Sequence, residues 1–157
     1  MKCRSALIAM LTALLPIAPA AAAPVELVSN IFVEKRGVDA AGKETVSLLP
    51  AERVVPGDRL LFVIRYKNAG AEAAGNFVIT NPVPQAVAYV GTEGVPPALV
   101  SVDGGTTYGE LATLRIKDAF GNERAATPAD VTHVQWKFAE ALPGGKTGQV
   151  AFRAQLR

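Results

Sequence analysis

Sulfur-containing residues are almost absent from this 157-residue chain, and the few that occur lie within its first ten positions. Cys3 is the only cysteine, and Met1 and Met10 are the only methionines. If this N-terminal segment is removed, the remaining chain can form no disulfide, no cysteine zinc site and no methionine copper site. Thiol catalysis is excluded in the same way.

A basic excess is also missing once the N-terminal segment is set aside. Lys2 and Arg4 belong to that segment, so the other 14 of the 16 basic residues balance the 14 acidic ones. Proteins that bind duplex nucleic acid gain much of their affinity by neutralising phosphates with lysine and arginine. Nucleic acid is therefore not an expected partner.

Histidine and tryptophan each occur once, which limits the chemistry available to the chain. His133 has no convergent partners in the sequence, so we expect a solvated strand residue and no histidine base or metal ligand. No nucleophile-elbow pattern and no phosphate-binding glycine loop occurs. Trp136 alternates with Val134 and Phe138, which predicts a position in the core. The sequence predicts no catalytic residues, no metal site and no cofactor.

The first 22 residues have the three parts of a secretory signal peptide. Lysine and arginine supply the positive region, residues 6–15 are almost entirely apolar, and the small residues Ala20–Ala23 follow two prolines. We expect cleavage after Ala22 and a single extracytoplasmic domain at 23–157 without a membrane span. An uncleaved anchor is the alternative, but the prolines shorten the apolar run below the length of a span.

Short segments of alternating polarity, separated by proline and glycine, fill the rest of the chain. Alternation with a period of two is typical of half-buried strands, and no segment has a helical pattern. The predicted strands are Val25–Lys35, Thr45–Leu49, Arg59–Lys67, Asn76–Thr80, Val87–Gly91, Leu99–Asp103, Leu111–Lys117, His133–Phe138 and Gln149–Arg157. Eight or nine strands, each with one apolar face, predict two packed sheets, with a closed barrel as the alternative.

Several turn and strand motifs follow one another in a fixed order. Val55-Pro56-Gly57-Asp58 and Asn68-Ala69-Gly70 flank the strand Leu60–Tyr66; later come Asn76–Pro84, Val87–Val90 and Leu142–Gly145. This order, over about residues 53–156, resembles the conserved-repeat "domain of unknown function eleven" modules of bacterial envelope and surface proteins. The resemblance implies an immunoglobulin-like antiparallel β-sandwich without general catalytic residues. Residues 24–52 would then be an N-terminal extension that adds one or two strands.

Three groups of polar loop residues could either bind a ligand or hold the backbone. Ser101–Tyr108 is similar to the Asp box of β-proteins, so Asp103 is expected to bond the backbone of a hairpin. The segment Asp118–Glu123 could suggest calcium, but it lacks the alternating acidic positions of a calcium loop, and a turn is expected. Asp58 and Asp130 are expected to accept bonds from local backbone N–H groups.

The sequence favours a non-enzymatic, exported interaction or structural module of the bacterial cell envelope. A module that binds carbohydrate or calcium is the alternative, and carbohydrate binding would require Trp136 or Tyr108 to be exposed beside a groove. A hydrolase would require acidic residues clustered in a deep pocket. A partner, an envelope or surface protein, is expected at a sheet edge. The terminal strand Gln149–Arg157 is the candidate edge, with Arg153 and Arg157 either docking the partner or guarding the edge.

Overall fold

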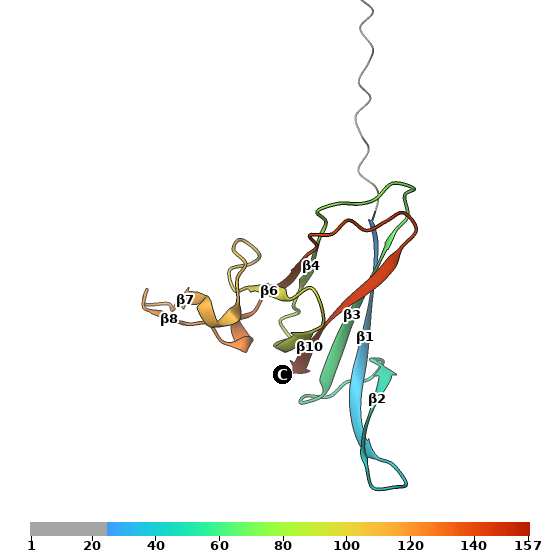
Figure 1. The fold of residues 1–157 in the computed structure, drawn as a ribbon. Helices are drawn as coiled ribbons and strands as arrows, with labels where there is room; N and C mark the ends of the chain where they lie inside the picture. The colour runs from blue at the N-terminus through green and yellow to red at the C-terminus, as the bar shows by residue number, and fades with distance from the viewer. Residues whose placement is uncertain (1–24) are drawn as a thin grey trace, which may run out of the picture.

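Ten β-strands and two short 3-10 turns make up the computed structural model, which describes residues 25–157 (Figure 1). The expected signal peptide and its cleavage site after Ala22 lie outside the described residues. The strands are β1 Val25–Val38, β2 Glu44–Pro50, β3 Arg59–Asn68, β4 Val78–Pro82, β5 Val87–Glu93, β6 Ala98–Ser101, β7 Arg115–Lys117, β8 Glu123–Ala125, β9 His133–Lys137 and β10 Thr147–Leu156. The 3-10 turns are η1 Leu111–Thr113 and η2 Pro128–Asp130. Within the described range no helix is long and apolar enough to cross a membrane.

The strands form two packed antiparallel sheets and a small hairpin. The larger sheet has the order β2-β1-β3-β10-β5, the smaller sheet has the order β4-β9-β6, and β7 pairs with β8. All the pairings are antiparallel. The predicted all-β sandwich is therefore confirmed. The described residues before position 53, which are expected to add one or two strands, contain β1 and β2.

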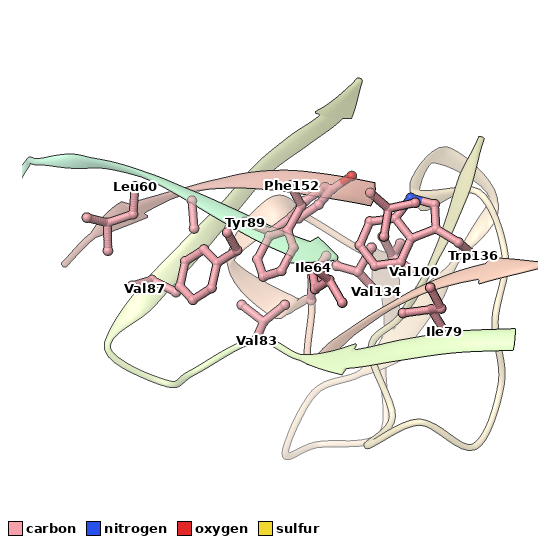
Figure 2. Packing of buried hydrophobic residues seen from close by; sticks show 14 of the residues in the cluster. Leu60, Ile64, Ile79, Val83, Val87, Tyr89, Val100, Val134, Trp136 and Phe152 are labelled. Carbon is pink, nitrogen blue, oxygen red and sulfur yellow. The ribbon is translucent and has the colours of Figure 1, made fainter. Parts of the chain in front are cut away.

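The core lies between the smaller sheet and strands β3, β10 and β5 of the larger one (Figure 2). Trp136 on β9 is 1% exposed, and its ring centroid lies 6.4 Å from that of Phe152 on β10. Phe62 on β3 stacks on Phe152 with ring centroids 4.5 Å apart. The predicted burial of Trp136 is confirmed, and its position connects the two sheets. The buried cluster contains Val33, Leu60, Phe62, Ile64, Ile79, Val83, Val87, Tyr89, Val100, Val131, Val134, Trp136, Val150, Phe152 and Ala154.

Two turns fix the ends of β3. In the turn before it, Asp58 N–H donates to the Val55 carbonyl at 3.0 Å and Gly57 has a φ of 92°, as a type II turn requires. At the other end Asn68 is fully buried. Its side-chain amide donates to the carbonyls of Glu72 and Leu142 at 2.7 and 2.9 Å. The side chain of Asn68 thus ties the end of β3 to the loop before β10.

Residues 111–117 do not form the continuous strand that the sequence predicts. Leu111–Thr113 is a 3-10 turn, and only Arg115–Lys117 is a strand, which pairs with the unpredicted strand β8. Leu111 and Leu114 both pack against the core cluster. Their spacing of three residues matches a 3-10 turn, in which positions three apart lie on one side.

The prediction that the terminal strand is a sheet edge is wrong. β10 lies inside the larger sheet, where it pairs with β3 on one side and with β5 on the other. The edges of this sheet are β2 and β5. Local alternation identifies a strand but carries no information about which distant strands flank it.

Candidate protein-interaction surface

The two arginines of the terminal strand are held by partners within the chain. Arg153 Nε donates to Glu34 Oε1 on β1 at 2.6 Å, and its Nη1 lies 2.6 Å from Glu93 Oε1 on β5. Glu93, and then Glu34, raise the pKa of the Arg153 guanidinium above its ordinary value. Arg157 donates to the carbonyl of Ala129 at 2.8 Å. Arg153 guards no sheet edge, because β10 is central, and Arg157 follows the last residue of that strand.

A hydrolase would require acidic residues clustered in a pocket, and one hollow of the surface contains two. Glu34 and Glu93 line one surface hollow together with Arg153. Both carboxylates are bonded to that arginine, which also holds the pKa of Glu93 below its ordinary value. A general acid needs a raised pKa at neutral pH. Glu93 therefore lacks the raised pKa of a general acid, and the two carboxylates connect β1, β10 and β5 through Arg153.

His133 lies on β9, on the side opposite Trp136, as its alternation predicts. It is half-buried, and its Nδ1 lies 3.1 Å from Thr132 Oγ1. Within residues 25–157 this is the one side-chain hydrogen bond of the imidazole. The Thr132 hydroxyl also donates to the Ser101 carbonyl at 3.1 Å, and no carboxylate of the described residues is bonded to the ring to orient it.

Asp103 organises the loop Ser101–Tyr108, in agreement with the structural role predicted from the Asp-box similarity. Its carboxylate accepts bonds from the Thr107 hydroxyl at 2.6 Å and from the backbone N–H groups of Thr106 and Thr107. Ser101 Oγ donates to it at 2.7 Å. These donors hold the pKa of Asp103 well below its usual range, and the Thr107 hydroxyl makes the largest contribution. Tyr108 is half-buried.

The other polar loops also bond their own backbone. Asp118 accepts the N–H groups of Phe120 and Asn122 at 2.8 and 2.9 Å. Asp58 accepts Val55 N–H, and Asp130 accepts Thr127 N–H, which confirms both predictions. In the part of the chain that is described, no three His, Cys, Asp or Glu side chains gather as a metal site would require.

The β1–β2 wing, defined here as residues 25–50, is the part of the molecule whose apolar groups lack cover. β1 and β2 lie on the far side of the larger sheet from the small hairpin, and their connecting turn extends past the end of β3 (Figure 1). β2 pairs only with β1, and every residue of β2 is exposed. Of the wing residues, Val33 is the one that joins the buried core.

Both faces of the wing carry exposed apolar side chains. Directly opposed residues of antiparallel strands lie on the same face, so the register places Ile31 and Leu49 on the core-side face. They are nevertheless 42% and 50% exposed, because the core between the two sheets reaches only Val33 of this wing. Val46 and Leu48 lie on the opposite face and are 60% and 48% exposed.

The exposed apolar groups are concentrated in this wing. It contributes seven of the 13 exposed large hydrophobic residues of the described chain: Leu27, Val28, Ile31, Val38, Val46, Leu48 and Leu49. Exposed apolar groups that gather in one part of a surface mark interaction sites, and Val46, Leu48 and Leu49 lie on β2 itself. Edge strands usually carry lysine, proline or a bulge that blocks pairing with another chain. β2 has its one charged residue, Glu44, and its one proline, Pro50, only at its two ends, and its middle residues Thr45–Leu49 pair with β1 without a register shift.

No family model matches this chain, and no curated protein or solved structure is significantly similar to it. The candidate surface is therefore defined by its geometry. An unprotected edge with apolar groups on both faces is suited to pairing with an extended segment of another chain.

The sequence alone predicts the strands of the wing but not its exposure. Burial of one face depends on whether a second sheet lies over it, and that depends on contacts between distant segments. One local signal is present, because Thr45–Leu49 has no charged residue although strand edges usually carry one.

Proposed function

We propose that this chain is a non-enzymatic, exported interaction module of the bacterial cell envelope, and that it binds an extended segment of another envelope protein along β2. The observation that carries the proposal is the unprotected edge of the wing. Its outward backbone groups have no partner strand in the described chain, and apolar side chains flank it on both faces. Such an edge is a template for strand addition.

The chemistry of β2 specifies the segment that it would take. Between Glu44 and Pro50 the strand carries no charge, with Val46 and Leu48 on one face and Leu49 on the other. A charged side chain on the incoming strand would lose solvation beside these groups without gaining an opposite charge. The partner segment is therefore uncharged, with apolar residues at alternate positions.

The N-terminal pattern and the order of motifs support the cellular setting. Positive, apolar and small-residue regions follow one another as in a secretory signal, so the exported product begins at Ala23, which its intact mass would reveal. The succession of turn and strand motifs supports kinship with the "domain of unknown function eleven" modules and an immunoglobulin-like arrangement. A chain without cysteine after residue 22 needs no disulfide chemistry in the compartment that receives it.

Site-specific photocrosslinking in the producing cells tests this function. A photoreactive residue replaces Val46 on β2 in one variant and Gln155 on β10 in the control, because Gln155 is exposed but lies on a central strand. We expect a discrete adduct with another protein from position 46 and none from position 155. An adduct only with a second copy of this chain, or none from position 46, would contradict the proposal.

A further inference from the structure

Phe120 is the one exposed aromatic residue of the molecule. All ten aromatic residues lie in the described part of the chain, and the other nine are buried or half-buried. Phe120 is 90% exposed, and it lies in the turn between β7 and β8. It makes no contact with the core cluster. The fold does not require an aromatic side chain at this position.

The turn that carries Phe120 is held in one conformation by its neighbours. The Asp118 carboxylate accepts the N–H groups of Phe120 and Asn122, and Gly121 N–H donates to the Asp118 carbonyl at 3.0 Å. Gly121 has a φ of 83°, which favours glycine. Ordering of the turn before binding lowers the entropy that a partner must remove.

The base of the hairpin is attached to the body of the protein. Arg124 on β8 makes two bonds of 2.8 Å to the Asp130 carboxylate, and Ala126 N–H donates to the Leu114 carbonyl at 3.0 Å. Asp130 belongs to the capping box of η2. The hairpin therefore presents Phe120 from a fixed support.

The cations of the hairpin have partners within the chain. Arg124 is paired with Asp130, and Lys117 lies 4.0 Å from Glu123. Arg115 donates to the carbonyls of Ala112 and Leu114. Binding to an anionic surface requires cations that are free to pair with it. The hairpin carries three cations and two carboxylates, and Asp130 at its base supplies a third carboxylate, so the apolar tip stands on a charge-balanced support.

We propose that the β7–β8 hairpin is a second docking element, in which Phe120 inserts into an uncharged apolar pocket of a protein partner. Aromatic side chains that fill a pocket are typical anchors of protein interfaces. A lipid bilayer is the less suitable partner, because even one whole acyl chain gives only marginal membrane binding and a single phenylalanine buries less apolar surface.

The hairpin and the β1–β2 wing lie on opposite sides of the molecule (Figure 1). Phe120 and β2 can therefore be occupied at the same time, so the chain would bridge two proteins. This bridging rests on the function proposed for the wing, whereas docking through Phe120 does not. The two sites are tested by different photoprobes, so failure of one leaves the other measurable.

The test replaces Phe120 with benzoylphenylalanine, which keeps an aromatic ring at the tip. The matched control carries the same probe at Val95, which is 91% exposed in another loop. Homogenates of the producing cells are irradiated in the presence of increasing amounts of purified wild-type or Phe120→Ser protein. We expect a discrete protein adduct from position 120 and none from position 95. At least about tenfold more Phe120→Ser protein than wild type should be needed to suppress it.

Several results would overturn the docking role of Phe120. They are the absence of an adduct from position 120, adducts with lipid alone, equal adducts from position 95, and equal competition by the Phe120→Ser protein. The Phe120→Ser variant should unfold at the wild-type temperature, because the turn is held by Asp118 and Gly121. A lower unfolding temperature would show that the side chain supports the fold and would contradict the proposed role.

Discussion

Trp136 connects the two sheets through a single side chain. It is almost completely buried on β9 and lies against Phe152 of the larger sheet. Its alternation with Val134 and Phe138 is enough to predict this position in the core. A periodic strand reveals the face of a residue, because successive side chains of a strand point to opposite sides.

Truncation of Trp136 should be among the most destabilising single changes. We expect Trp136→Ala to lower the free energy of unfolding by about 3–5 kcal/mol, since it leaves a large cavity between the sheets. Urea denaturation measures this loss. Val78→Ala on β4 is the matched control, because Val78 is exposed, and it should change stability by less than about 0.5 kcal/mol. A loss below about 1 kcal/mol for Trp136→Ala would contradict the packing.

Asp103 makes the free energy of unfolding depend on pH in the acid range. Its pKa is held below the ordinary value of 3.8, chiefly by the Thr107 hydroxyl and backbone N–H. A group with a lowered folded pKa stabilises the protein above the unfolded pKa, and this stability is lost as pH falls through the folded pKa. The wild-type free energy of unfolding should therefore decrease below about pH 4.

The Asp103→Asn variant should lack this part of the acid response. We expect lower stability than wild type at about pH 7 and a shallower decline below about pH 4, measured by urea denaturation at several pH values. Thr107→Val removes one of the donors, so its loss of stability below about pH 4 should be intermediate between those of wild type and Asp103→Asn. An acid decline in Asp103→Asn as steep as in wild type would show that the loop bonds do not carry the effect.

Among the secondary-structure elements, the strands are predictable from the sequence but their neighbours are not. The segments around Leu60, Val134 and Phe152 alternate clearly, and each forms a strand with the predicted face. The terminal strand is predicted at an edge, yet β10 pairs with β5 as well as with β3. Strand order depends on contacts between residues far apart in the sequence, and local periodicity does not predict those contacts.

A lysine on β2 should block the proposed docking without harming the fold. Leu48→Lys adds a charge to an exposed position, so the free energy of unfolding should change by about 0.5 kcal/mol or less. The adduct from the photoprobe at position 46 should disappear, because an incoming strand would have to bury that charge. Gln155→Lys is the control and should leave the adduct intact. An undiminished adduct in Leu48→Lys would exclude strand pairing there.

For the molecule as a whole, stability comes from packing, hydrogen bonds and ion pairs. The chain after residue 22 contains no cysteine, and the described residues form no metal cluster. Dithiothreitol and EDTA should therefore leave Tm unchanged, as thermal unfolding followed by circular dichroism would show. A drop in Tm with EDTA that calcium restores would point to the Asp118–Glu123 turn as a binding site.

The shape of the molecule explains why its surface is the hardest feature to predict. The core lies against β3, β10 and β5 of the larger sheet, while the β1–β2 wing and the β7–β8 hairpin lie at opposite sides of the molecule (Figure 1). Alternating apolar residues are buried in β3 and exposed in β2. The sequence predicts a strand for both segments. Their burial differs because the smaller sheet packs over β3 but does not extend over β2.

The claim that a partner strand pairs with β2 is tested most directly by amide hydrogen exchange. The measurement compares the purified protein with its complex recovered from the producing cells, residue by residue along Glu44–Pro50. In the free protein, the amides of β2 that point away from β1 should exchange rapidly, while those of β10 should be among the slowest. In the complex, the outward amides of β2 should become protected, because backbone hydrogen bonds to a new strand slow their exchange. Unchanged exchange along β2, with protection appearing instead at β5 or elsewhere, would contradict the account.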